Sequence, residues 1–342
     1  MTTVPDDAHD DALARADQEH DLMIEAATLY YEEELTQAEI GQRLATSRST
    51  VSRLLRDARA QGVVKIAIQN PWARNSQLEA ALRSAFGLRD ARVLRSGGRP
   101  ADVVLDGVGA LTARYLQGAL ADGMVLGVSY GRSIAATIRH LTPTRPLDLV
   151  VVQLLGALGS DNPLIEGANL ARNLAAKYGA SYRYLYAPLV VEDRRTRDLI
   201  AQEPLVQDVL AVGRQADIAL IGIGALGEEA PSLIYRGYLT AADVARLRGL
   251  GGVGNMCAQF FDAHGHLLDT DLNRRSISIG LDGLKGISQV VAAAGGRSKA
   301  PAILGALRGG HVDVLISDDQ AIEAVMALHV RGPKPAPRDI RP

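Results

Sequence analysis

Residues 36–62 read TQAEIGQRLATSRSTVSRLLRDARAQG, and this stretch predicts two short helices joined by a tight turn. Thr36 is followed three residues later by Glu39, which is the spacing of a capping box at a helix N-terminus. Ser47 suits the N-cap of the second helix, and Gly62 suits the position just after its end. The stretch therefore predicts a helix-turn-helix pair.

The apolar positions of the pair support this interpretation, because they recur at helical spacing. They are Ala38, Ile40, Leu44 and Ala45 in the first helix, and Val51, Leu54, Leu55 and Ala58 in the second. Ala45 and Thr46 form the expected turn. Residues 20–34 show a third apolar face, so we expect a three-helix unit.

The polar face of the second helix carries side chains that contact nucleic acids. Guanidinium groups bind phosphates and guanine edges, and short hydroxyls let a helix lie close to the groove. The residues expected to contact DNA are Gln37, Arg48, Ser49, Thr50, Ser52, Arg53 and Arg56. Between Arg43 and Lys65, six basic residues stand against one acid, Asp57. The alternative is an amphipathic hairpin whose basic face is merely solvated.

Composition bounds the rest of the chain. A length of 342 residues predicts two domains, and a net charge of −2 means that any nucleic-acid binding is local. The single Cys257 excludes a disulfide framework and a multi-cysteine metal site. No apolar run is long enough to span a membrane, and the acidic first residues do not resemble a secretion signal. We therefore expect a cytoplasmic protein with no membrane partner.

The domain boundary is expected at Asn70–Trp72, where a proline interrupts the pattern. Residues 1–18 are expected to be a disordered tail, and residues 19–70 a helix-turn-helix domain, possibly winged by a short strand over 63–68. Residues 71–331 would form an effector-binding and oligomerisation domain, and residues 332–342 a flexible tail.

The second domain alternates strand and helix patterns. Candidate strands are 91–94, 125–128, 149–154, 218–223, 257–261, 289–293 and 312–316. Candidate helices are 103–120, 133–140, 164–178, 205–216, 241–247, 301–308 and 319–328. Continuous apolar strands between helices predict an α/β domain with a doubly wound, mostly parallel sheet. Ligands bind at the carboxyl ends of the strands in such sheets, so candidate sites are sought there.

Three glycine-containing loops follow candidate strands. Gly127, Ser129, Gly131, Arg132 and Ser133 open a helix, where backbone N–H groups and hydroxyls form a cradle for an anion. Gly222 and Gly224 are a weaker signal, because the third glycine of a dinucleotide fingerprint is missing. Gly295, Gly296 and Lys299 suit a phosphate or a sugar hydroxyl. Each loop is also compatible with a strand-to-helix turn that binds nothing.

Two other stretches allow competing interpretations. Asp262, His264 and His266 read as a metal cluster or as a polar turn between strands, and we favour the turn, so no metal and no cofactor is expected. Asn255 lies just upstream and is a candidate hydrogen-bonding partner for a hydroxyl. Residues 127–131 match the bare pattern of a hydrolase nucleophile elbow, but hydrolysis leaves the helix-turn-helix unexplained.

Taken in order, these motifs resemble the SorC/DeoR-type sugar-binding transcriptional regulators over about residues 21–328. The segments that carry the resemblance are LTQAEIGQRLATSRSTVSRLLRDARAQGVVKI, GVSYGRS, DIALIGIGAL, GNMCAQFFDAHG and GGRSKAPAILGALRGGHVDVLISD. The resemblance implies an effector domain related to ribose-5-phosphate isomerase, glucosamine-6-phosphate deaminase and CoA transferases. It also implies operator DNA, a sugar-phosphate or polyol-phosphate effector, and a homodimer or homotetramer.

Carried over by position, the resemblance gives roles to the strand-end residues. Ser129, Gly131 and Ser133 would hold the effector phosphate, and Lys299 would be a second phosphate contact. Gly222, Gly224 and Asn255 would lie near the sugar. The expected function is a DNA-binding regulator of carbohydrate or polyol metabolism and not an enzyme. The alternative is a sugar-phosphate isomerase or deaminase with an accessory helix-turn-helix.

Overall fold

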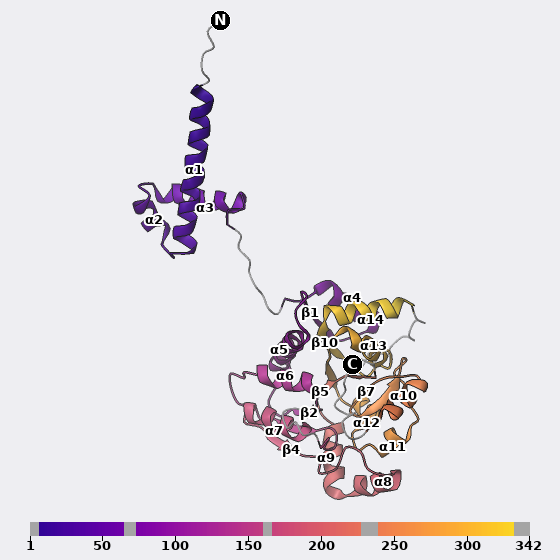
Figure 1. Cartoon of the computed structure of the whole chain (residues 1–342). Coiled ribbons are helices and arrows are strands. Elements are labelled where there is room, and N and C mark those ends of the chain that lie inside the picture. Colours follow the sequence, from indigo (N-terminus) through magenta and orange to yellow (C-terminus); the bar gives the residue numbers. More distant parts are fainter. Residues whose placement is uncertain (1–6, 65–72, 160–165, 227–238, 332–342) are drawn as a thin grey trace. The chain divides into compact units, whose positions relative to one another are not determined.

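A computed structural model gives the fold of residues 7–64, 73–159, 166–226 and 239–331, and of residues 7–17 the backbone alone. The chain divides into two compact units, one ending at Asn70 and the other beginning at Pro71. Each unit has its own hydrophobic core, and they are described separately (Figure 1).

The N-terminal unit contains helices α1 (Asp7–Tyr31), α2 (Gln37–Arg43) and α3 (Arg48–Ala60). Its core joins α1 to both later helices, and its buried residues are Met23, Ala26, Ala27, Leu29, Ile40, Val51, Leu54, Leu55 and Ala58. The four buried positions predicted for the second helix are therefore confirmed. The capping box of Thr36 and Glu39 is present, and the side chain of Ser47 accepts the N–H of Thr50 at 3.1 Å.

Three details of this unit differ from the prediction. In α2 only Ile40 and Gly41 are buried, whereas Ala38 and Ala45 are exposed, because the helix ends before Ala45 and rests on its partners along one narrow stripe. Helix α1 begins at Asp7, inside the segment expected to be disordered, since an alanine-rich sequence has high helix propensity. The expected strand or wing lies largely at residues 65–68, outside the described residues.

A seven-stranded sheet forms the centre of the C-terminal unit, and every pair of neighbouring strands in it is parallel. Its spatial order is β1-β10-β9-β5-β2-β3-β4. The strands are β1 (Asp90–Leu94), β2 (Val125–Val128), β3 (Val150–Gln153), β4 (Ser181–Arg183), β5 (Ile218–Gly222), β9 (Gln289–Ala293) and β10 (Val314–Asp318). The predicted parallel α/β class is confirmed.

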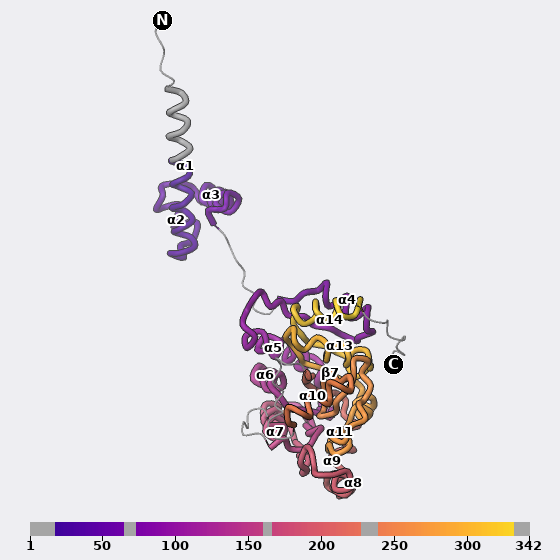
Figure 2. The backbone as a smooth tube through the Cα atoms, turned by 45° about the vertical axis from the view of Figure 1, so that its right-hand side comes forward, coloured from indigo at the N-terminus to yellow at the C-terminus, as the bar shows by residue number. Residues whose placement is uncertain are grey.

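Helices cover both faces of the sheet. Helices α5 (Ala101–Ala119), α6 (Arg132–His140) and α7 (Gly167–Tyr178) pack on one face and lie on one side of the domain in Figure 1. The other face is covered by α4 (Ser76–Phe86), α9 (Pro204–Arg214), α12 (Gly280–Lys285), α13 (Ala300–Arg308) and α14 (Asp319–Arg331). The first and last of these, α4 and α14, lie side by side in Figures 1 and 2.

A small antiparallel sheet stands apart from the parallel one. It contains β6 (Gly224–Ala225), β7 (Gly252–Met256) and β8 (Gln259–Asp262), and α10 (Ala241–Gly249) leads into it. The strand predicted over 257–261 is therefore displaced, because Cys257 and Ala258 form the turn between β7 and β8. Two further helices, α8 (Arg194–Gln202) and α11 (Asp271–Arg275), and a short 3-10 turn, η3 (Arg297–Lys299), complete the described elements.

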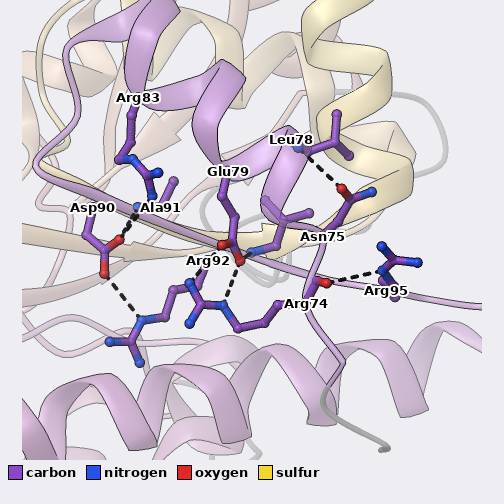
Figure 3. A network of polar contacts seen from close by, with 10 residues as sticks. Arg74, Asn75, Leu78, Glu79, Arg83, Asp90, Ala91, Arg92 and Arg95 are labelled. Atoms are coloured by element: carbon purple, nitrogen blue, oxygen red, sulfur yellow. Dashed lines mark hydrogen bonds and ion pairs between the residues drawn. The ribbon is translucent and has the colours of Figure 1, made fainter.

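One edge of the large sheet is closed by side chains and by the incoming chain (Figure 3). Glu79 is buried on α4, accepts the N–H of Val93 at 2.9 Å and forms a two-pronged ion pair with Arg74. Asn75 donates its backbone N–H to the carbonyl of Val93 at 2.8 Å. The free edge of β1 is thereby satisfied, which prevents pairing with a foreign strand.

Candidate functional site

The first candidate surface is the exposed side of α3. The buried stripe of this helix turns Arg48, Ser49, Ser52, Arg53 and Arg56 towards solvent. Thr50 and, on α2, Gln37 are half-buried. All seven residues expected to contact DNA therefore belong to the α2–α3 pair and retain access to solvent.

Hydroxyls gather at the start of α3. Ser47 Oγ lies 2.7 Å from Ser49 Oγ and 2.8 Å from Thr50 Oγ1, so the cap and the first turn form one small polar cluster. Arg53 lies 3.8 Å from Glu19 on α1, in an ion pair whose side chains are both exposed. Such pairs contribute little to stability, so this arginine can exchange its partner for a phosphate at low cost.

The second candidate is a cavity of about 840 Å³ in the C-terminal unit, at the carboxyl ends of β2, β5, β9 and β10. Ten of the eleven predicted effector residues line it, namely Ser129, Gly131, Arg132, Ser133, Gly222, Gly224, Asn255, Gly295, Gly296 and Lys299. Loops far apart in the chain thus meet here, since Gly131 and Gly296, for example, are separated by 165 positions.

Gly127 is the exception and does not line the cavity. It lies inside β2, and a Cβ placed there would come within 2.6 Å of Leu154 Cδ2. The glycine at this position is therefore required by packing of the strand and not by ligand approach.

One wall of the cavity is the N-terminus of α6. Gly131 caps this helix with a φ of 118°, and no side chain caps it, so the first-turn N–H groups are available to a ligand. Ser129 and Ser133 are both buried beside it. Ser129 Oγ accepts the N–H of Gly222 at 3.2 Å, which leaves its hydroxyl proton free to donate. This wall presents backbone and hydroxyl donors to the cavity, and the helix dipole adds positive potential.

Lys299 adds a cation to the same cavity. Burial, and to a lesser extent the positive charge of Arg132, lower the pKa of its ammonium group to about 8, against the opposing effect of Asp318. Lys299 and Arg132 are like charges that disfavour each other, and a bound anion that contacts both lowers this repulsion. The electrostatics of the cavity therefore favour an anionic ligand.

Sequence reasoning missed several residues of the cavity wall. Asp318 ends β10, is almost fully buried, and accepts the N–H groups of Gly296 at 2.6 Å and Ala321 at 3.0 Å. In the sequence, the acidic residue directly after an apolar run was the signal that could have identified Asp318. The other missed polar residues are Arg99, Asp102, Tyr130, Cys257, Ser298 and Gln320.

The β7–β8 hairpin also lines the cavity, through Asn255 and Cys257. Asn255 is 5% exposed and pairs across the small sheet with Gly224. The two residues of the turn, Cys257 and Ala258, have φ values of 47° and 61°. This conformation costs a non-glycine residue of order 1–3 kcal/mol, and such strain is commonly kept at functional sites. Burial also raises the pKa of the Cys257 thiol to about 12, so the thiol is protonated at neutral pH.

The loop with two histidines is a polar turn. Asp262 Oδ1 accepts the backbone N–H groups of His264 at 2.8 Å and His266 at 2.9 Å. Within the described residues, no group of three or more His, Cys, Asp or Glu side chains has a metal-binding arrangement. The described helices also include none with the length and apolarity needed to cross a bilayer.

The chain matches the protein family described as "Putative sugar-binding domain" over residues 70–327. Residues 27–61, which include the whole α2–α3 pair, match the description "Sigma-70, region 4". The first match contains the residues of the cavity, and the second contains the exposed face of α3.

Relatives match along nearly the whole chain. The deoxyribonucleoside regulator of Bacillus subtilis is 30% identical and covers 90% of this chain and 98% of its own length. The transcriptional regulator LsrR of Klebsiella pneumoniae is 31% identical, with coverages of 91% and 94%. Among solved structures, the full-length sorbitol operon regulator SorC of Klebsiella pneumoniae has a TM-score of 0.71 at 28% identity, covering 89% of this chain and 98% of its own.

Proposed function

Because this chain belongs to the SorC/DeoR family of sugar-binding transcriptional regulators, we propose that α3 reads operator DNA and that the strand-end cavity binds a phosphorylated sugar or polyol. The observation that carries the proposal is the meeting of ten separately predicted residues around one cavity. The family is one of regulators of carbohydrate and polyol operons, and the enzyme alternative is set aside.

The DNA half of the proposal rests on the polar face of α3. Arg48, Arg53 and Arg56 reach solvent from a helix whose other side is fixed in a core, as a helix in the major groove requires. Ser49, Thr50 and Ser52 are short enough to let the backbone approach the groove, and Gln37 lies at the start of α2. We assign this contact surface to residues 19–70.

The effector half rests on the cavity in residues 71–331. A phosphate fits the α6 N-terminus, where first-turn N–H groups, the hydroxyls of Ser129 and Ser133, and the cations of Arg132 and Lys299 converge. Relatives carry names that refer to deoxyribonucleosides, sorbitol and erythritol, which are sugars or polyols, or contain them. Gly222, Gly224 and Asn255 would contact the carbon chain of such a ligand.

We also propose a homodimer or homotetramer. A single helix-turn-helix contacts only one half-site, and a two-fold assembly places two such helices on successive turns of the duplex. The effector would alter the spacing or stability of these helix-turn-helix units, which requires that it bind one state of the assembly better than the other.

A thermal-shift panel tests the effector half. Full-length protein is heated with phosphorylated sugars and polyols and with their unphosphorylated forms. A ligand at 100 times its Kd adds roughly 2.7 kcal/mol of stability, which a melting curve resolves easily. Stabilisation by phosphorylated compounds that is lost in Lys299→Ala supports the phosphate assignment. Stabilisation by free sugars alone would contradict it.

Fluorescence anisotropy tests the DNA half with duplexes enriched by in vitro selection on the full-length protein. We expect Arg53→Ala to weaken binding by about tenfold or more, as loss of a groove contact does. Arg145→Ala is the matched control, because it removes the same charge from an exposed ion pair with Asp122 in the C-terminal unit. Equal affinities for both variants would show that α3 is not the reading helix.

A further inference from the structure

The first residues that the structure describes in the C-terminal unit are fastened to the segment that follows β1 (Figure 3). Arg95 donates its backbone N–H to the carbonyl of Ala73 at 2.8 Å. Its side-chain Nε donates to the carbonyl of Arg74 at 3.1 Å. Because the DNA-binding unit precedes Ala73 in the chain, a movement of the segment after β1 reaches the point at which that unit is attached.

The same segment is also held from the side of the cavity. Arg99 lines the cavity, donates Nε to the carbonyl of Ser96 at 2.8 Å and donates Nη2 to the carbonyl of Arg95. Asp319 Oδ1 accepts the backbone N–H of Ser96 at 3.0 Å and the proton of its hydroxyl. The described wall of the cavity does not include Asp319 itself, but it includes the residues on either side of it in sequence. Residues 95 and 96, here called the β1 turn, therefore connect the cavity to the start of the unit.

An anion in the cavity competes with the β1 turn for the guanidinium of Arg99. A guanidinium binds a phosphate in a two-pronged pair of opposite charges, and such bonds are stronger than those to neutral carbonyl groups. A bound phosphate therefore draws Arg99 towards the cavity and weakens its hold on the carbonyls of Arg95 and Ser96. The effector binds better when the β1 turn is released, which is the difference in affinity that control of a second site requires.

We infer that the effector controls DNA binding through the β1 turn, by taking Arg99 from it so that the bond from Arg95 to Ala73 opens more often. Asp319 is then a positioning residue, which keeps the turn in place when no anion competes for Arg99. This inference rests on the proposed function, because it takes the cavity to bind a phosphorylated effector, and it names the residues through which that effector acts.

Asp319→Ala is the informative change, because it loosens the β1 turn without altering the lining of the cavity. It removes the acceptor of both Ser96 bonds, so the variant without a ligand should resemble the wild type with one. Asp313→Ala is the matched control. Asp313 directly precedes β10 whereas Asp319 follows it, both are half-buried, and Asp313 Oδ2 accepts the backbone N–H of Val290 at 2.8 Å.

Fluorescence anisotropy on the full-length proteins measures affinity for the selected operator duplex with and without a probe. The probe is whichever of inorganic phosphate, ribose 5-phosphate and sorbitol 6-phosphate raises the melting temperature most. Without it, Asp319→Ala should already shift operator affinity by about threefold or more, in the direction in which the probe shifts the wild type. Adding the probe should then change this variant less than the wild type, and Asp313→Ala should respond as the wild type does.

Hydrogen exchange gives a second measurement that does not involve DNA. The amide of Arg95 should exchange about threefold or more faster when the probe is bound to the wild type, because its bond to Ala73 opens more often. The same increase is expected in Asp319→Ala without a probe and is not expected in Asp313→Ala. Melting temperatures of both variants verify that each is folded.

The outcomes separate this inference from the proposed function. Equal shifts of operator affinity in the two variants, or a shift in Asp319→Ala opposite to that caused by the probe, would overturn the inference and leave the effector site in place. An Arg95 amide that does not respond to the probe would overturn it as well. If the probes raise the melting temperature but none changes operator affinity of the wild type, the proposed control by the effector fails together with the inference. If none raises the melting temperature, the phosphate assignment fails, and the inference fails with it.

Discussion

At the scale of the residue, Lys299 makes anion binding depend on pH. Its pKa of about 8 lies below the ordinary value because burial and the charge of Arg132 disfavour the ammonium form. As the pH rises through this value, the ammonium group loses its proton and its positive charge. We therefore expect the stabilisation by inorganic phosphate to fall between about pH 8 and 9.5. Phosphate is already mostly dianionic at pH 8, so the charge of the ligand changes little over that range.

Melting temperatures with and without phosphate measure this effect. Lys299→Arg is the control, because a guanidinium stays charged throughout the range and should make the phosphate effect independent of pH. If the wild type and this variant lose stabilisation in parallel, another group in the cavity is titrating.

Substitution of glycine by alanine should have opposite effects on stability at two positions. A methyl group at Gly127 would lie 2.6 Å from Leu154 Cδ2 in the sheet, so Gly127→Ala should destabilise the protein by about 1–3 kcal/mol. Gly118 lies in α5 with open space at its Cβ position, and Gly118→Ala should gain up to about 1 kcal/mol from helix propensity. Urea unfolding of both variants measures the difference, and a harmless Gly127→Ala would refute the packing role.

At the scale of the element, the turn of the helix-turn-helix carries strain at Ala45, whose φ is 49°. A left-handed conformation costs an L-residue about 1–2 kcal/mol, whereas glycine loses about 0.5–1 kcal/mol of chain entropy on folding. Ala45→Gly should therefore stabilise the N-terminal unit by about 0.5 kcal/mol. Hydrogen exchange of the α3 amides in the full-length protein reports the change.

Ala38→Gly is the control for that prediction, since Ala38 is exposed in the regular helix α2. The same substitution there should cost about 1 kcal/mol, because glycine is a poor helix former. Slower exchange in Ala45→Gly and faster exchange in Ala38→Gly is the expected pattern. Faster exchange in both variants would mean that the turn is not strained.

The elements that sequence predicts well are those specified by neighbouring residues. The caps at Thr36 and Ser47 and the buried positions of α3 depend on spacings of three and four residues, and the structure confirms them. The β7–β8 hairpin was missed for the converse reason. Its turn uses Cys257 and Ala258, whereas turns with two positive φ angles normally contain asparagine or glycine.

At the scale of the whole molecule, the cavity depends on an order of strands that no local pattern encodes. β10 lies between β1 and β9, so the last strand of the sequence is placed beside the first. That order brings Asp318 next to Gly296, although the two belong to different strand ends. The glycine loops could be predicted one by one because each follows its own strand. Asp318 also follows an apolar run, but its contact with Gly296 can be known only from the strand order.

Coupling between the two units is the property that makes such a molecule a regulator. If an effector changes operator affinity by some factor, operator DNA must change effector affinity by the same factor, since both bind one set of states. We expect a factor of roughly 5 to 150. The test titrates the tightest-binding sugar phosphate into full-length protein with and without a saturating operator duplex, and separately measures operator affinity with and without that sugar phosphate.

The direction of the change identifies which state the effector prefers, and Ser133→Ala provides the control. Ser133 lines the cavity and is remote in sequence from α3. Loss of its hydroxyl should therefore lower the affinity for the effector without altering operator affinity in the effector's absence. In the variant, the factor by which the effector changes operator affinity should still equal the factor by which the operator changes effector affinity. Only the effector concentration needed to reach saturation should be higher. Unequal factors would mean that the sugar phosphate also binds outside the cavity, and factors of one would mean that the cavity does not control the DNA-binding unit.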